Sequence, residues 1–124
     1  MNLNQVTVSV ADIERSIDFY EKLGLRLIVK ALPHYARFEC IEGDSTFSLH
    51  HVNKPAHDTG TNIYFEVLDL DNFVNRLINK GFVFEEMPND KPWLWREARL
   101  KDPDNNMLIL FFAGDKRKNP PWRI

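Results

Sequence analysis

The chain is poor in the features that build disulfide scaffolds, metal clusters and membrane spans. Cys40 is the only cysteine among 124 residues, so the chain has neither an internal disulfide nor a cysteine-rich zinc motif. No apolar run approaches the roughly 20 residues that a membrane-spanning helix needs. The first ten residues lack a basic segment followed by an apolar one, as a secretory signal requires. We therefore expect a soluble, cytoplasmic protein with no membrane partner.

The chain also lacks a charge imbalance. Sixteen Lys and Arg residues against eighteen Asp and Glu residues give a formal net charge of −2, so nothing indicates a nucleic-acid partner. Apolar residues make up 44% of the chain and charged residues 27%. These values are ordinary for globular proteins and exclude the disordered and fibrous classes. A chain of this length is expected to form one domain, over residues 1–124.

Two segments that lie 57 positions apart share one pattern. Each begins with a strand-like run in which apolar and polar residues alternate, and each continues as an apolar stripe at helical spacing. At this offset Asp12 matches Asp69, where a side chain can cap the helix. Gly24 matches Gly81, and a residue in the left-handed conformation at these positions ends each predicted helix. The shared order of strand, Asp, helix and Gly indicates an internal duplication.

Three strand-like stretches, separated by turn residues, follow each predicted helix. They span 25–30, 35–41 and 46–52 in the first half, and 82–87, 93–100 and 107–112 in the second. The pattern is therefore βαβββ repeated twice, which predicts an α+β fold. Its expected parts are module 1 over about 1–53, a linker over 53–60, module 2 over about 61–113 and a C-terminal tail over 114–124.

The run from Gln5 to Gly24 resembles the opening module of the vicinal oxygen chelate superfamily. That family contains glyoxalase I, bleomycin-resistance proteins, fosfomycin-resistance enzymes and extradiol dioxygenases. The run from Asp102 to Met107 resembles the hairpin before its last strand, and the segments 93–98 and 120–124 resemble one uncharacterised bacterial branch. The resemblance covers essentially the whole chain. It implies two βαβββ modules whose curved mixed sheets enclose a cavity, in a homodimer.

In the enzymes of this family, four inward-facing strand positions hold a divalent metal. The resemblance places these positions on Gln5, Ser48, Asn62 and Ile109. Gln5 offers a neutral oxygen ligand, but Ile109 cannot bind a metal, and Ser and Asn are poor ligands for Zn, Ni or Fe. Two of the positions also supply the proton-transfer base in glyoxalase I. We therefore expect no glyoxalase I activity and no cofactor.

A relocated metal site is the alternative. His50 shares a strand face with Ser48, and Glu66 shares one with Asn62. Together with Gln5, these two residues offer nitrogen and oxygen ligands for one Zn, Ni, Mn or Fe ion, with Glu66 as the catalytic candidate in a lyase, isomerase or dioxygenase. In the simpler interpretation His50 forms hydrogen bonds in the cavity wall, and Glu66 lies at its rim.

The expected cavity wall combines apolar area with a few hydrogen-bonding groups, as sites for small organic molecules do. Its predicted members are Gln5, Thr7, Ser48, His50, Asn62, Tyr64, Glu66, Trp93, Trp95, Arg96, Ile109 and Phe111. We expect Trp93 and Trp95 on one face of a strand and Arg96 on the other face, and an aromatic pair beside an arginine suits a planar or anionic ligand. Alternatively, the tryptophans are core residues, and Arg96 pairs with Glu97 or Glu85.

Three functions are compatible with this sequence. The favoured one is the binding of a small organic molecule in a metal-free cavity. The second is metal-dependent catalysis at the relocated site, and the third is an interaction protein whose cavity is filled by its own side chains. The tail ending Pro120-Pro121-Trp122-Arg123-Ile124 is either an anchor that docks on this domain or on a second subunit, or a solvated end.

Overall fold

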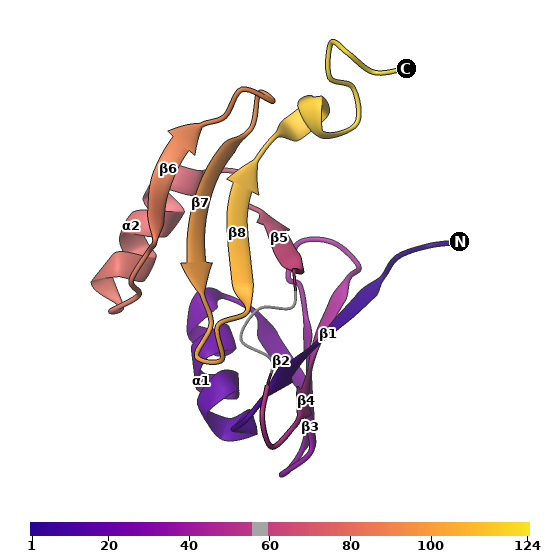
Figure 1. The fold of residues 1–124 in the computed structure, drawn as a ribbon, viewed down its shortest axis with the longest axis vertical. Coiled ribbons are helices and arrows are strands. Elements are labelled where there is room, and N and C mark those ends of the chain that lie inside the picture. Colours follow the sequence, from indigo (N-terminus) through magenta and orange to yellow (C-terminus); the bar gives the residue numbers. More distant parts are fainter. Residues whose placement is uncertain (56–59) are drawn as a thin grey trace. The chain divides into compact units, whose positions relative to one another are not determined.

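The structure is a computed structural model that describes residues 1–55 and 60–124 (Figure 1). Its elements are β1 (Gln5–Val10), α1 (Ile13–Leu23), β2 (Arg26–Ala31), β3 (Tyr35–Glu39), β4 (Thr46–His51), β5 (Asn62–Glu66), α2 (Leu70–Asn79), β6 (Glu86–Asp90), β7 (Arg96–Lys101), β8 (Met107–Phe112) and the 3₁₀ helix η1 (Gly114–Arg117). The predicted βαβββ repeat and the α+β class are confirmed.

The two halves form four-stranded mixed sheets of identical topology. The strand order is β1-β4-β3-β2 in the first sheet and β5-β8-β7-β6 in the second. β1 runs parallel to β4, and β5 runs parallel to β8, whereas the other paired strands are antiparallel. The chain divides into two compact units, Met1–Thr59 with Asp102–Asn106, and Gly60–Lys101 with Met107–Ile124. The loop between β7 and β8 therefore belongs to the first unit.

In the first unit, α1 covers one face of the sheet. The helix buries one stripe, and Tyr20 is fully buried with its ring centroid 4.7 Å from that of Phe47 and 5.9 Å from that of Phe38. Val8 and Val10 of β1 are buried, whereas Gln5 and Thr7 are exposed. The alternation seen in the sequence thus puts apolar residues on the helix-covered face and polar residues on the other.

In the second unit, α2 packs on β6, β7 and β8 (Figure 1). Leu70, Val74 and Leu77 are its buried residues, and Leu108 and Leu110 are buried in β8. Among residues 1–55 and 60–124, neither α-helix has the length and apolar character that crossing a membrane requires. Both sheets therefore have one helix-covered face and one helix-free face.

All four predicted end residues lie at the helix ends, but only one of the two aspartates makes a capping hydrogen bond to the backbone. Asp12 caps α1, since its carboxylate accepts a hydrogen bond from the Arg15 backbone N–H at 3.1 Å. Gly24 and Gly81 have φ values of 124° and 97°, in the left-handed region that favours glycine. Asp69 precedes α2 but makes no capping bond to the backbone. Its carboxylate instead accepts a hydrogen bond from the Asn72 side chain at 2.7 Å.

Two predicted strands are wrong at their ends. The strand expected at 82–87 lies at Glu86–Asp90, and the one expected at 93–100 begins only at Arg96. Residues 91–95 form a turn in which Leu94 has a φ of 68°. Trp93 and Trp95 therefore do not alternate on a strand. Their spacing imitates strand alternation, but Pro92 has no N–H to donate to a sheet, which favours a turn.

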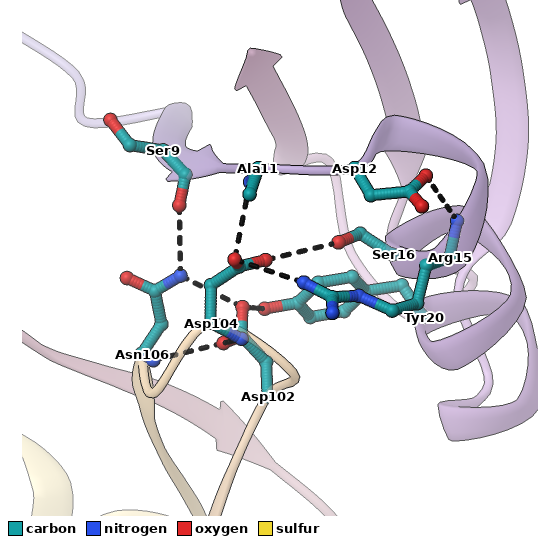
Figure 2. A network of polar contacts seen from close by, with 9 residues as sticks. All are labelled: Ser9, Ala11, Asp12, Arg15, Ser16, Tyr20, Asp102, Asp104 and Asn106. Carbon is teal, nitrogen blue, oxygen red and sulfur yellow. Dashed lines mark hydrogen bonds and ion pairs between the residues drawn. The ribbon is translucent and has the colours of Figure 1, made fainter. Parts of the chain in front are cut away.

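The loop between β7 and β8 is held to α1 by a buried hydrogen bond (Figure 2). Tyr20 Oη donates to Asp102 Oδ2 at 2.6 Å. Asp102 Oδ1 accepts the backbone N–H groups of Asp104 and Asn106, each at 2.9 Å. Burial, the Asp102 charge and hydrogen bond, and the Asp104 charge raise the pKa of Tyr20 well above its usual value. The hydroxyl therefore remains a donor.

Asp104 fastens the same loop to the start of α1 (Figure 2). Its Oδ1 accepts from the Ala11 backbone N–H at 3.1 Å and from Arg15 Nη2 at 3.0 Å. The Asn106 side chain donates to the Ser9 carbonyl at 3.2 Å. Asn105 has a φ of 66°, a conformation that Asn tolerates better than most residues. The predicted turn at 102–106 is thus also a clamp on the first unit.

Tyr20→Phe is expected to lower the free energy of unfolding by about 1–3 kcal/mol, because it leaves the buried Asp102 carboxylate without its hydroxyl donor. Urea denaturation followed by circular dichroism measures the change. Tyr64→Phe is the control, since that side chain is 45% exposed, and its effect should stay within about 0.5 kcal/mol. Equal effects of the two substitutions would show that the Tyr20 hydroxyl does not hold the loop.

Candidate functional site

The helix-free face of the first sheet is polar. Alternate positions of three adjacent strands meet there in register: Gln5, Thr7 and Ser9 of β1, Thr46, Ser48 and His50 of β4, and Tyr35, Arg37 and Glu39 of β3. Four of the predicted cavity residues, Gln5, Thr7, Ser48 and His50, therefore share one face of one unit. The polar face brings hydroxyl, amide, imidazole and guanidinium groups together.

Tyr35 is the centre of a hydrogen-bonded cluster on this polar face. Arg37 Nε donates to Tyr35 Oη at 2.8 Å, and Tyr35 Oη shares a hydrogen bond of 2.8 Å with Ser48 Oγ. The Arg37 guanidinium carbon also lies 5.5 Å from the centre of the Tyr35 ring. Ser48 is fully buried. Gln5 is held nearby, since its Oε1 accepts from Thr46 Oγ1 at 2.8 Å.

The cluster changes the acidity of the Tyr35 phenol. Burial acts to raise the pKa of Tyr35, but hydrogen bonds with Ser48 and Arg37, the positive charge of Arg37 and a hydrogen bond from Gln5 together lower it below its usual value. Each of these groups stabilises the phenolate more than the phenol. Tyr35 is therefore suited to donate a proton or a strong hydrogen bond to a bound molecule.

The sequence interpretation missed Tyr35 and Arg37. Within 35–39 the residues alternate, since Ala36 and Phe38 are fully buried and Tyr35, Arg37 and Glu39 take the other face. This alternation was a readable signal that the three residues share a face. It did not reveal that Tyr35 and Arg37 meet Ser48, because that contact depends on the register between two strands.

The helix-free face of the second sheet is aromatic and apolar near β8. Its residues are Asn62, Tyr64 and Glu66 of β5, Met107, Ile109 and Phe111 of β8, and Glu97, Arg99 and Lys101 of β7. Five predicted cavity residues, Asn62, Tyr64, Glu66, Ile109 and Phe111, share this face.

An aromatic cluster lies on this second face. The Trp95 ring stacks on Phe111 with centroids 4.7 Å apart and planes at 23°. Tyr64 meets both rings edge-on, 5.9 Å from Trp95 and 5.6 Å from Phe111. Ile109 and Phe111 are buried, whereas Tyr64 is 45% exposed. The cluster therefore offers an accessible aromatic surface on a buried apolar base.

Two charged side chains are buried or partly buried beside the aromatic cluster. Glu97 is fully buried, and its Oε1 accepts from Trp93 Nε1 at 2.7 Å. Its Oε2 lies 3.4 Å from Arg99 Nη2, and Arg99 Nε lies 3.4 Å from Glu86 Oε2. The Trp93 indole N–H thus donates a hydrogen bond to a buried carboxylate. The alternative prediction, that the tryptophans are core residues, did not include this contact.

Arg96 faces away from this aromatic surface. Its register places it on the α2 side of β7, on the same face as Ala98. Its guanidinium pairs with Asp71 and with Asp90, each at 3.0 Å. The predicted alternative partners, Glu97 and Glu85, are wrong because Arg99 and Lys101 pair with them. The hydrogen bonds that Arg96 donates to Asp71 and Asp90, and the charges of the two carboxylates, raise the pKa of Arg96.

Glu66 is occupied by backbone donors. Its Oε1 accepts from the N–H groups of Ala113 and Gly114 at 3.2 and 2.8 Å. Arg117 Nε lies 3.6 Å from its Oε2. Glu66 therefore joins the end of β5 to the start of η1. In the C-terminal tail beyond η1, Trp122 is 56% exposed, so it is not buried against the described chain.

The predicted metal ligands are spread over both units. Gln5 and His50 lie on the first sheet, four register positions apart, which is roughly 13 Å along a strand. Glu66 lies on the second sheet. Within residues 1–55 and 60–124, no group of three or more His, Cys, Asp or Glu side chains is arranged to hold a metal ion. His57, in the predicted linker over 53–60, lies outside the described residues.

Arg37→Met is expected to raise the pKa of Tyr35, because it removes the cation and the N–H donor that stabilise the phenolate. The change can be followed by NMR titration of protein labelled at the tyrosine ring carbons. Arg26→Met is the matched control, since Arg26 pairs with Glu39 at 2.8 Å. A Tyr35 pKa that stays the same in the Arg37 variant would contradict the phenolate-stabilising role of the cluster.

Comparison with known proteins gives one family and a shared fold. A family model described as the Glyoxalase/Bleomycin resistance protein/Dioxygenase superfamily matches residues 2–110. No curated protein matches the chain.

Several solved structures share the fold at low sequence identity. A glyoxalase/bleomycin resistance protein/dioxygenase from Nocardioides is 21% identical, with a TM-score of 0.76 over 100% of this chain and 89% of that one. TioX from Micromonospora sp. ML1 is 18% identical, with a TM-score of 0.76 over 91% and 99% of the two chains. A bleomycin resistance determinant encoded on the transposon Tn5 is 17% identical, with a TM-score of 0.77 over 92% and 99%.

Proposed function

Because the chain belongs to the Glyoxalase/Bleomycin resistance protein/Dioxygenase superfamily, we propose that it binds a small organic molecule at the helix-free faces of its sheets, without the four-ligand metal site of the family's enzymes. The aromatic cluster of Tyr64, Trp95 and Phe111 is the observation that carries this proposal. Large aromatic surfaces with a few adjacent polar groups are typical of sites for small organic ligands.

The chemistry of the donor groups favours a metal-free site. Of the four positions that the family's enzymes use, Ile109 has no donor atom and is fully buried. Ser48 is engaged with Tyr35 and Gln5 with Thr46. Neutral amide and hydroxyl groups are weak ligands for Zn, Ni or Fe, which prefer imidazole, thiolate or carboxylate. These residues do not fit a metal centre of that type.

The polar face of the first unit offers a second set of groups that a small organic molecule can contact. Burial of aromatic area provides most of the binding free energy, and a few fixed donors and acceptors set the orientation of the ligand. Tyr35, Ser48 and Gln5 are such groups, because their mutual hydrogen bonds hold them in place before a ligand arrives. Preorganised groups of this kind lower the entropic cost of binding.

Saturable quenching of tryptophan fluorescence by members of a panel of planar aromatic compounds is the expected result, and a chelator should not change it. Trp95→Phe should remove most of the quenching, because Trp95 lies in the aromatic cluster. Trp122→Phe is the matched control, since Trp122 is 56% exposed in the tail, and its quenching should match that of the unchanged protein. Quenching that needs a metal, or that persists without Trp95, would contradict the proposal.

Metal content gives the control for the same experiment. Untagged protein dialysed without chelator should contain far less than one equivalent of Zn, Ni, Mn or Fe by plasma mass spectrometry. A full equivalent that is lost in His50→Ala would contradict the metal-free proposal. That outcome would favour a metal-dependent lyase, isomerase or dioxygenase that uses Gln5, His50 and Glu66.

We also propose that the protein is a homodimer, as the family resemblance implies. The edge strand β2 supports this proposal, because Ile28 and Val29 are 46% and 36% exposed on it. Exposed apolar edge strands tend to pair with another chain. Light scattering after size exclusion should give twice the 14.6 kDa chain mass, and Ile28→Lys should lower it. Ile78→Lys on α2 is the control, and a monomeric wild type would refute the proposal.

A further inference from the structure

The two units hold an arginine at equivalent positions of their helix-free faces. Arg37 in β3 is paired in register with Ser48 of β4, and Arg99 in β7 is paired with Ile109 of β8. Both arginines are partly buried. Because the sheets have the same topology, the surroundings of one arginine can be compared directly with those of the other.

The chain itself neutralises Arg99. Its Nη2 lies 3.4 Å from Glu97 Oε2, and its Nε lies 3.4 Å from Glu86 Oε2. Glu97 is fully buried, so this carboxylate has lost its hydration and depends on nearby cations and donors. In the second unit, the arginine at this position is therefore paired with two carboxylates of its own chain.

Arg37 has no such carboxylate. The position equivalent to Glu97 is occupied by Tyr35, since Tyr35 pairs in register with His50 as Glu97 does with Phe111. Glu39, two positions along the same strand face, is bound to Arg26 at 2.8 Å. Over residues 1–55 and 60–124, Arg37 forms no ion pair.

The Arg37 side chain is nevertheless fixed in position. Its Nε donates to Tyr35 Oη at 2.8 Å, and its guanidinium lies over the Tyr35 ring. This hydrogen bond leaves the two terminal nitrogens, which form a planar fork that matches the oxygens of a carboxylate or a phosphate. A partly buried cation that is held in place without a counter-charge is a favourable partner for an anion from outside the chain.

The neighbouring hydroxyl groups add one further donor. Tyr35 and Ser48 together carry two hydroxyl protons, and the hydrogen bond between their oxygens uses only one of them. Tyr35 Oη already accepts from Arg37. The second hydroxyl proton is therefore available to an oxyanion beside the guanidinium.

We propose that Arg37, with Tyr35 and Ser48, binds an oxyanion group, a carboxylate or a phosphate, carried by the small organic molecule. This inference rests on the proposed ligand-binding function and names the chemical class of its ligand. Arg99, which is neutralised by Glu97 and Glu86, would take no part in anion binding.

Benzoate, phenyl phosphate and benzamide are the probes for this inference. Benzamide has nearly the shape of benzoate but carries no charge. With the full chain at constant ionic strength, benzoate or phenyl phosphate should shift the ¹H–¹⁵N NMR signals of β3 and β4, with a Kd at least about tenfold lower than that of benzamide. The anion that binds more tightly identifies the group as a carboxylate or a phosphate.

Arg37→Met is the decisive variant. It should raise the Kd of the preferred anion by about tenfold or more and remove its advantage over benzamide. Arg37→Lys, which retains the charge but not the planar fork, should fall between it and the wild type. Arg26→Met, in which a cation already paired with Glu39 is removed, should bind the anion as the wild type does. The Arg37→Lys comparison still tests the inference if Arg37→Met does not fold.

Two results would overturn the inference. One is equal affinity for benzamide and for both anions, and the other is an equal effect of the Arg37 and Arg26 substitutions. Neither would affect the quenching of Trp95 fluorescence by uncharged aromatic compounds, so the proposed function would stand. Conversely, anion binding that depends on Arg37, without any quenching of Trp95, would confirm the oxyanion site and refute the aromatic ligand.

Discussion

The first unit depends on one buried hydrogen bond, from the Tyr20 hydroxyl to the Asp102 carboxylate. Tyr20 is at the centre of the α1 contact with the sheet, against Phe38 and Phe47. Asp102 holds its own loop closed through two backbone N–H groups. This buried contact, together with those of Asp104 and Asn106, joins a helix-on-sheet core to a loop that is more than eighty residues distant in the chain. A buried carboxylate that accepts several hydrogen bonds is favourable, whereas one that loses a partner is costly.

The clamp also leaves the opposite side of the sheet free for other chemistry. Because the α1 face takes the apolar alternate positions, the polar positions of β1, β3 and β4 face away from the core. Tyr35, Arg37 and Ser48 can then interact with one another without weakening the packing of α1. The second sheet follows the same division, but its helix-free face carries aromatic rings and buried ion pairs instead. One topology therefore supports two chemically different surfaces.

The sequence was informative where structure is determined locally. Alternation in β1, the Asp12 cap and the Gly24 stop depend on near neighbours, and all three were predicted correctly. The Trp93–Trp95 segment was not, because the turn at 91–95 overrides the strand preference of tryptophan. Glu66 was placed on a face, but its bonds to the start of η1 involve residues nearly fifty positions away. The Tyr35 cluster likewise depends on strand register, which a single sequence does not reveal.

The path of the chain has a consequence for its cohesion. The chain leaves the second unit at Asp102, contributes five residues to the first, and returns at Met107. A cut between residues 53 and 60 would therefore divide the first unit, because Asp102–Asn106 would remain on the C-terminal fragment. The N-terminal fragment would carry Tyr20 without Asp102, which accepts its hydroxyl hydrogen bond, and the C-terminal fragment would carry Asp102 without Tyr20. Such fragments are complementary by construction, so recovery of the native structure requires that they reassociate.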